Sequence, residues 1–246
     1  MSIVISEPHP GVRQLTMDRP ATKNALDIES YSALAAGLQA ADADANVHAI
    51  ILTGANGTFS SGNDLADFRR HSDPTPARQL LRALVLVETP LVAAVEGAAV
   101  GIGATMLLHC DLVVAARSAS FRMPFVPLGL TPEGGSSFLL PRMAGAKLTA
   151  EILLFGDPFS VDVADRAGLI NRVVDDGEAL RTALALAARL GELPPLGLRA
   201  AHKLLHRDRE ELLAVIDEEI AIFKERLESA EAQAILNSFG DRASRR

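Results

Sequence analysis

The spacing of apolar residues predicts strands that alternate with helices over most of the chain. Three short, almost continuous apolar runs are typical of strands that are buried on both faces, as in a parallel sheet. These runs are residues 49–53, 90–97 and 111–116. An α/β architecture with mostly parallel pairing is therefore expected.

The first strands follow a different pattern. Residues 3–6 and 12–17 alternate apolar and polar side chains, and turn-forming residues lie between them, so we expect a hairpin at the edge of the sheet. Apolar residues then recur at helical spacing over residues 26–41, with Asp27 as a candidate N-cap, and again over residues 79–87.

From residue 178 onward the pattern is almost entirely helical. In the segment 210–227 an apolar stripe has the spacing of one helix face. The stripe consists of Leu212, Ile216, Ile220, Phe223 and Leu227. Such a stripe packs either in the chain's own core or on a neighbouring subunit. We divide the chain into a core, residues 1–190, and a C-terminal helical region for oligomerisation, residues 191–246.

Composition narrows the class of protein. Of the 246 residues, 48% are hydrophobic but only 4% aromatic, so the core is aliphatic. A net charge of -7 with a pI near 5.4 disfavours nucleic-acid or anionic membrane partners. The single Cys110 excludes an internal disulfide. Without a secretion signal or an apolar run of about 18 residues, a cytoplasmic location is expected.

Two glycine-bearing segments are candidates for binding chemistry. Each follows a strand and leads toward a helix, at positions 60–65 (Ser-Ser-Gly-Asn-Asp-Leu) and 97–103 (Gly-Ala-Ala-Val-Gly-Ile-Gly). Two such turns can each aim one backbone N–H at an oxygen on which negative charge develops. We predict that the amides of Asn63 and Ile102 are these donors. The alternative for the first segment is an ordinary turn with Asp64 as a helix cap.

Glu133 is the candidate proton carrier. It lies between Pro132 and two glycines, in an apolar neighbourhood near the start of an expected helix. Burial raises the pKa of such a carboxyl, whereas a helix N-terminus lowers it. The alternative is a glutamate that caps the first turn of that helix.

Together these motifs resemble the crotonase, or enoyl-CoA hydratase/isomerase, superfamily. The resemblance rests on segments 17–26, 59–65, 95–103 and 110–112 and on the helical C-terminus. It implies a crotonase-like α/β fold, a spiral of ββα units with a C-terminal helical trimerisation region. It also implies an acyl-CoA thioester substrate and a homotrimer or a dimer of trimers.

The acidic residues point to one branch of the superfamily. Where similar hydratases carry two glutamates, this chain has Thr105 and Phe125, and neither can carry a proton. The chain instead resembles the peroxisomal-type Δ3,Δ2-enoyl-CoA isomerases, whose single catalytic glutamate falls on Glu133. This resemblance implies an isomerase that moves a double bond from the β,γ to the α,β position. The alternatives are a hydratase or other thioester-enolate enzyme, and a non-catalytic acyl-CoA-binding or RNA-binding homologue.

The resemblance also implies where the substrate binds. In the C-terminal region, Arg199, His202, Lys203 and His206 share one helix face, which is either solvated or near a CoA phosphate. The substrate-binding residues implied are Lys23, Ala25, Leu26, Ser61, Gly62, Asp64, Leu65, Gly101, Phe125 and Lys203. No metal site is expected, and no cofactor beyond the coenzyme A of the substrate itself.

Overall fold

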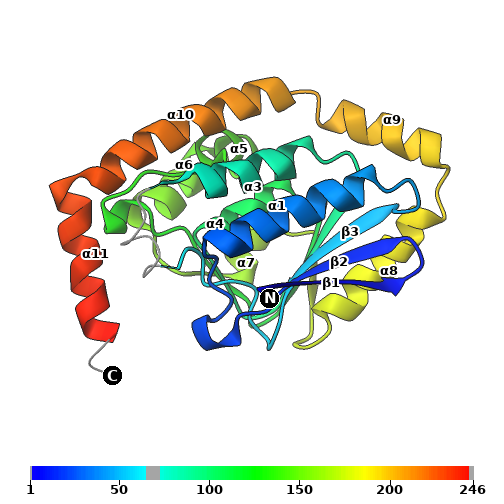
Figure 1. The fold of residues 1–246 in the computed structure, drawn as a ribbon, viewed down its shortest axis with the longest axis horizontal. Coiled ribbons are helices and arrows are strands. Elements are labelled where there is room, and N and C mark those ends of the chain that lie inside the picture. Colours follow the sequence, from blue (N-terminus) through cyan, green and yellow to red (C-terminus); the bar gives the residue numbers. More distant parts are fainter. Residues whose placement is uncertain (1, 65–72, 244–246) are drawn as a thin grey trace.

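The computed structural model describes residues 2–64 and 73–243 (Figure 1). Leu65, a predicted substrate-binding residue, lies outside the described residues.

A six-stranded sheet forms the centre of the protein, with strand order β1-β2-β3-β4-β6-β9. Every neighbouring pair is parallel except β1 with β2, which form the predicted edge hairpin. The strands are β1 Ile3–His9, β2 Val12–Met17, β3 Ala49–Gly54, β4 Leu91–Val95, β6 Leu112–Ala116 and β9 Arg172–Val174.

A second sheet of three short strands has the order β5-β7-β8. Its strands are β5 Ala98–Val100, β7 Ser120–Arg122 and β8 Phe159–Ser160. The sequence does not predict β5, β8 or β9, because two or three residues are too few to reveal a periodic pattern.

Both faces of the large sheet are covered, which explains its apolar strands. In β3, Ile50 and Leu52 point into one hydrophobic cluster, whereas Ala49 and Ile51 point into the other. Helices α1 (Ile28–Ala43) and α3 (Thr75–Leu86) pack together over the first face, and α8 (Ala179–Gly191) packs on the second. Asp27 caps α1 as predicted, because its carboxylate accepts a hydrogen bond from the Ser30 N–H at 2.8 Å.

Short helices connect the second sheet to the C-terminal part. The helix toward which the second glycine segment leads divides into a turn of α-helix and a turn of 3-10 helix. These connecting helices are α4 Ile102–Thr105, η2 Met106–His109, η3 Val126–Leu128, α5 Ser136–Met143, α6 Gly145–Ala150, η4 Glu151–Phe155 and α7 Val161–Arg166; a 3-10 turn, η1 Pro20–Thr22, precedes α1.

Three helices complete the chain: α9 (Pro195–Leu205), α10 (Arg209–Glu228) and α11 (Ala230–Ala243). Figure 1 shows α10 running across the molecule above α3, and the two helices pack together. Four of the five residues in the α10 stripe are buried in the chain's own core, and Leu212 packs against it. The stripe is therefore intramolecular. Within residues 2–64 and 73–243, no helix is long and apolar enough to span a membrane.

Candidate active site

The two glycine-bearing segments lie side by side. The Ser60 N–H donates to the Ala98 carbonyl and the Val100 N–H donates to the Ser60 carbonyl, both at 2.9 Å. Gly62 has a φ of +88°, and a Cβ at this position would lie 2.5 Å from the Val100 oxygen. Only glycine permits so close an approach of the two backbones in that conformation.

The backbone amides of Asn63 and Ile102 have no helix or sheet partner within residues 2–64 and 73–243. Leu26 and Asn63 form a parallel bridge that uses the carbonyl of Gly62 and the N–H of Asp64. The N–H of Asn63 therefore has no acceptor in residues 2–64 and 73–243. The N–H of Ile102 is in the first turn of α4, where no helical carbonyl precedes it.

The side chain of Asn63 is occupied elsewhere. Its carbonyl oxygen accepts a hydrogen bond from the hydroxyl of Tyr31, which is buried in α1. This contact holds the side chain toward α1. The backbone amide of Asn63 stays the predicted donor to a substrate oxygen.

A cavity of about 190 Å³ opens where the two glycine-bearing segments meet. Its walls are mainly apolar and include side chains from α10 and α11 as well as predicted site residues. The lining residues are Ser61, Gly62, Asn63, Val100, Gly101, Arg122, Pro124, Phe125, Pro127, Leu128, Leu130, Phe223 and Leu236. The structure thus brings five predicted site residues to one cavity: Ser61, Gly62, Asn63, Gly101 and Phe125.

Glu133 is buried next to the second glycine segment. Its side chain is 4% exposed, and its Oε1 accepts a 2.6 Å hydrogen bond from the Thr105 hydroxyl at the end of α4. Burial raises the pKa of Glu133 to about 8, although the Thr105 hydrogen bond opposes the rise. Of the two opposing influences expected from sequence, burial is the larger. Glu133 is not among the described residues that line the cavity.

Glu219 is a second buried carboxyl, and the sequence does not reveal it. It comes from α10, is 7% exposed, and accepts hydrogen bonds from the N–H groups of Gly135 (2.6 Å) and Ser137 (3.0 Å). It therefore caps α5, the role that was the alternative for Glu133. Burial raises the pKa of Glu219, and its negative charge contributes to the raised pKa of Glu133.

His109 supports the segment that carries Glu133. Its Nε2 lies 2.8 Å from the Gly134 carbonyl oxygen, so Nε2 carries the hydrogen, because a carbonyl can only accept. Burial lowers the pKa of His109 to about 4, so the ring is neutral at pH 7. The sequence predicts only a structural or surface histidine here, and the contact assigns it to positioning Gly134.

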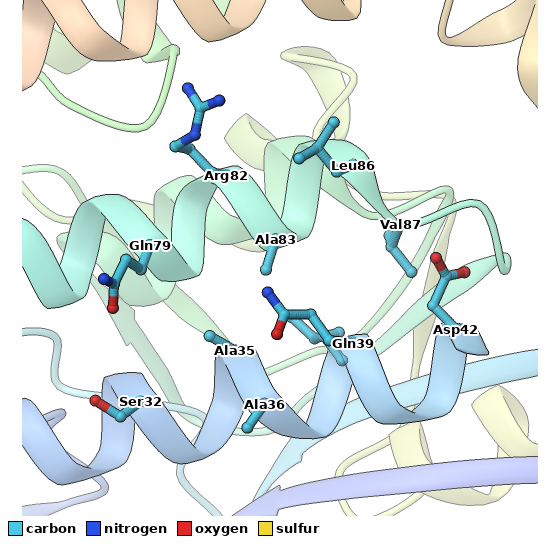
Figure 2. Close-up of a pocket in the computed structure, with 11 residues that line it drawn as sticks. Ser32, Ala35, Ala36, Gln39, Asp42, Gln79, Arg82, Ala83, Leu86 and Val87 are labelled. Carbon is cyan, nitrogen blue, oxygen red and sulfur yellow. The ribbon is translucent and has the colours of Figure 1, made fainter. Parts of the chain in front are cut away.

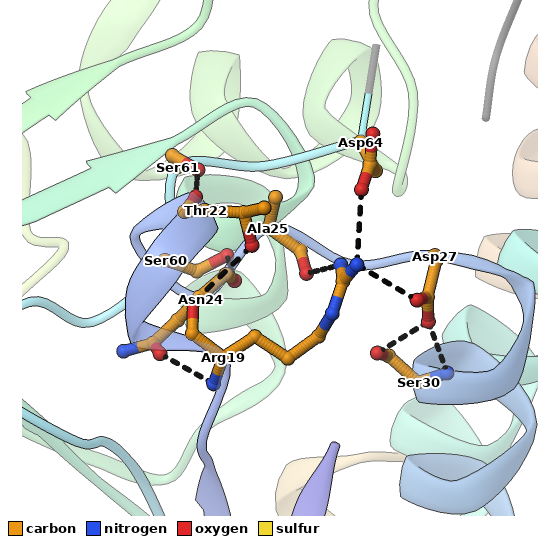
Figure 3. A network of polar contacts seen from close by, with 9 residues as sticks. All are labelled: Arg19, Thr22, Asn24, Ala25, Asp27, Ser30, Ser60, Ser61 and Asp64. Carbon is orange, nitrogen blue, oxygen red and sulfur yellow. Dashed lines mark hydrogen bonds and ion pairs between the residues drawn. The ribbon is translucent and has the colours of Figure 1, made fainter. Parts of the chain in front are cut away.

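A polar network joins the loop of residues 23–26, which carries predicted substrate-binding residues, to the first glycine segment (Figure 3). The Arg19 guanidinium donates to the Ala25 carbonyl at 2.6 Å and lies 3.0 Å from Asp27 and 3.1 Å from Asp64. The Ser61 N–H donates to the Lys23 carbonyl at 3.0 Å. The alternative of Asp64 as a helix cap remains untested, since a helix starting after it would lie outside the described residues.

The three predicted binding residues of this loop, Lys23, Ala25 and Leu26, differ in their exposure to solvent. Lys23 is exposed with a φ of +53°, whereas Ala25 and Leu26 are buried. The Ala25 carbonyl already accepts from Arg19 but retains a second lone pair for a ligand. Lys203 is exposed on α9, and Figure 1 shows α9 and the loop on opposite sides of the molecule. Within one chain, Lys203 does not join the other predicted residues.

Another cavity is a groove of about 530 Å³ between α1 and α3 (Figure 2). Its only acidic lining residue is Asp42, whose carboxylate already accepts hydrogen bonds from Glu88 and Thr89. None of the predicted site residues lines it. The smaller cavity at the glycine segments is therefore the candidate active site.

Comparison with known proteins agrees with this geometry. The Enoyl-CoA hydratase/isomerase family matches residues 7–244, which is almost the whole chain. The chain belongs to this family, whose members act on acyl-CoA thioesters, and it is an enzyme of the family.

Several curated relatives are similar over most of the chain. The 1,2-epoxyphenylacetyl-CoA isomerase of Escherichia coli is 39% identical over 80% of this chain and 79% of its own length. The Enoyl-CoA delta isomerase 2 of Rattus norvegicus is 34% identical over 93% of this chain but only 61% of its own length. The 2,3-dehydroadipyl-CoA hydratase of Escherichia coli is 34% identical over 85% of this chain and 84% of its own length.

The fold is also confirmed by solved structures. Pseudomonas aeruginosa OdaA superposes with a TM-score of 0.93 at 41% identity, over 97% of this chain and 98% of that one. The predicted crotonase-like α/β fold is therefore correct, including helices at the C-terminus.

Proposed function

We propose that the protein is an enoyl-CoA isomerase, which moves the double bond of a 3-enoyl-CoA thioester into conjugation at the 2 position. One observation carries the proposal. Glu133 is a buried carboxyl with a pKa raised to about 8, beside Thr105 and the second glycine segment. Such a group can both take and return a proton near neutral pH.

In the proposed reaction the amides of Asn63 and Ile102 bind the thioester oxygen. Ionised Glu133 removes a proton from C2, and the electron pair of that bond moves toward the thioester oxygen to form a dienolate. Protonated Glu133 then gives the proton to C4, and the C3=C4 double bond is replaced by C2=C3. No atom is gained or lost, so the proposed reaction consumes no cofactor. Two backbone donors are suited to stabilising the enolate charge.

The side chains around the site support isomerisation rather than hydration. A hydratase needs acid and base groups that position and activate water. Here Phe125 forms part of the apolar cavity wall, and Thr105 donates its hydrogen bond to Glu133. The second carboxyl nearby, Glu219, is committed to the N–H groups at the start of α5. Hydration remains the second candidate, because relatives of similar identity are named hydratases.

The substitution Glu133→Gln tests the proposal. It keeps the shape of the side chain but removes the base, so conversion of 3-enoyl-CoA to 2-enoyl-CoA should fall by at least about a thousandfold. Binding of the product thioester, measured by calorimetry, should change less than about threefold. Glu151→Gln, which alters an exposed glutamate, is the matched control. Full turnover by Glu133→Gln would remove Glu133 from the mechanism.

A second assay separates isomerase from hydratase. A 2-enoyl-CoA offered in water should keep its conjugated absorbance over the time in which the 3-enoyl isomer is fully converted. Rapid loss of that absorbance in the 2-enoyl sample would favour hydration.

The resemblance also supports two proposals about context: the CoA phosphates would meet Lys23, and the chain would assemble as a trimer or a dimer of trimers. A cytoplasmic location is a third proposal, which rests on the sequence features given above. Light scattering on the purified protein tests the assembly, since a monomer mass would exclude it. Lys23→Ala should raise the KM for the thioester, and an unchanged KM would contradict the proposed contact.

A further inference from the structure

Asp111, His202 and His206 form a compact cluster that the proposed reaction does not use. The Nε2 of His206 lies 2.8 Å from Oδ1 of Asp111, and the Nε2 of His202 lies 3.1 Å from both oxygens of that carboxylate. One ligand atom from each residue lies within 4.8 Å of the other two. The ring centroids are 4.4 Å apart.

The local structure explains why the three side chains converge. His202 and His206 are one helical turn apart, at α9 and its C-cap, so their side chains share a face. Asp111 comes directly before β6, and its other oxygen, Oδ2, accepts a 2.7 Å hydrogen bond from the Leu91 N–H. That hydrogen bond orients the carboxylate. In metal sites, groups that hydrogen-bond to a ligand commonly orient it in this way.

We propose that this cluster binds one zinc ion through Asp111 Oδ1 and the Nε2 atoms of His202 and His206, with water as the fourth ligand. Two imidazoles and one carboxylate are a known protein ligand set for zinc. Tetrahedral bonds of about 2.0–2.1 Å place neighbouring ligand atoms about 3.3–3.4 Å apart. The observed histidine-to-carboxylate separations of 2.8 and 3.1 Å need to open by about 0.2–0.6 Å. The two histidine nitrogens lie within 4.8 Å of each other and must reach the same spacing.

The cluster is also accessible from one side. His202 is buried, but His206 is half-buried and lines a cavity of about 240 Å³. The cavity reaches the cluster at His206, whereas Asp111 and His202 do not line it. The neighbouring Cys110 is not part of the set, because its thiol donates to the Met106 carbonyl.

Bound zinc would join parts of the chain that are far apart in sequence. The ligands come from α9 and from the start of β6, and the Leu91 contact extends the connection to β4. Zinc would therefore fasten α9 to the central sheet. This site is separate from the proposed isomerase chemistry, which needs no metal.

The test is metal titration of the full-length protein after treatment with a chelator. Zn²⁺ in competition with a chromophoric chelator should bind at one equivalent per chain, and Co²⁺ should give the intense visible bands of a four-coordinate site. Mg²⁺ should not compete, because it prefers oxygen ligands. Zinc should also raise the Tm by several degrees, because it binds the folded state.

Variants assign the binding to these residues. His206→Ala and His202→Gln should each weaken Zn²⁺ binding by about 100-fold or more, whereas His9→Ala, which alters an exposed histidine, should not. Circular dichroism of the metal-free variants checks that they fold. The proposal would be overturned if the protein did not bind Zn²⁺ stoichiometrically, or if both variants bound it as the wild type does. The cluster would then only hydrogen-bond α9 to the segment before β6. Glu133→Gln should bind Zn²⁺ normally, so this outcome is independent of the isomerase proposal.

Discussion

The Thr105 hydroxyl donates a 2.6 Å hydrogen bond to the buried carboxyl of Glu133. The resemblance implies that similar hydratases carry a glutamate at the position of Thr105. In this chain the Thr105 hydroxyl instead stabilises the ionised form of Glu133, the candidate base. The hydrogen bond lowers the pKa of Glu133, while burial and the charge of Glu219 raise it. The ionisation of Glu133 should therefore respond to changes in either neighbour.

Removing the Thr105 hydroxyl should raise the pKa of Glu133 further. Thr105→Val keeps the shape of the side chain, and the loss of one hydrogen bond to a charged group should move the midpoint of kcat/KM from about pH 8 to about pH 9. Isomerase activity at pH 7 should then fall about tenfold. Thr105→Ser restores a hydroxyl and should keep the midpoint near that of the wild type. An unchanged midpoint in Thr105→Val would show that the hydrogen bond does not tune the base.

Glu219→Gln should move the same midpoint in the opposite direction. The substitution removes a negative charge that raises the pKa of Glu133, so the midpoint should fall below pH 8. A glutamine has one acceptor oxygen in place of two, so Gly135 or Ser137 loses a partner and stability should drop by about 1–3 kcal/mol. Measuring kcat/KM against pH together with urea unfolding separates the two effects. A loss of stability without any shift of the midpoint would give Glu219 a purely structural role.

The pH dependence of stability should also report on Glu133. Its pKa is raised from 4.5 to about 8 on folding, so the folded state holds its proton more tightly than the unfolded chain. The contribution to stability is present in full below about pH 4.5 and is lost as pH rises to about 8. At pH 9, Glu133→Gln should be more stable than the wild type by roughly 1–3 kcal/mol, with little difference at pH 5. Urea unfolding at the two pH values measures this, and equal differences at both would contradict it.

Asn63 should contribute through its backbone. Because its side chain is bonded to Tyr31, Asn63→Ala should leave the proposed donor in place and reduce kcat/KM by less than about tenfold. Tyr31→Phe, which releases the same side-chain contact from the other end, is the matched control. A loss of about a hundredfold or more in Asn63→Ala alone would show that the side chain itself contacts the substrate.

Much of the fold could be predicted because local patterns determine it. The buried strands β3 and β4 are apolar on both faces, a pattern that indicates a sheet covered on both sides. Helix α1 has a capping Asp27, and its Tyr31, Leu34 and Leu38 are buried at the predicted helical spacing. Strands β8 and β9 were missed because they pair through only two or three residues.

The site was predictable only where its residues lie in contiguous motifs. The two glycine segments and Glu133 belong to such motifs. Glu219 does not, since it contacts groups 82 to 84 positions away, and Asp111 meets His202 across 91 positions. Such contacts depend on how α9 and α10 fold back over the core. A sequence pattern within either helix carries no information about them.

The Arg19 network has a consequence for how binding energy reaches the reacting atoms. Arg19 joins the Ala25 carbonyl to Asp64, and the Ser61 N–H donates to the Lys23 carbonyl. The loop of Lys23, which is proposed to meet the CoA phosphates, is therefore hydrogen-bonded to the segment that carries the Asn63 amide. A nucleotide that tightens the loop would also fix the position of that amide. Under the proposed function, a thioester truncated to its pantetheine end would therefore react with a lower kcat and not only a higher KM.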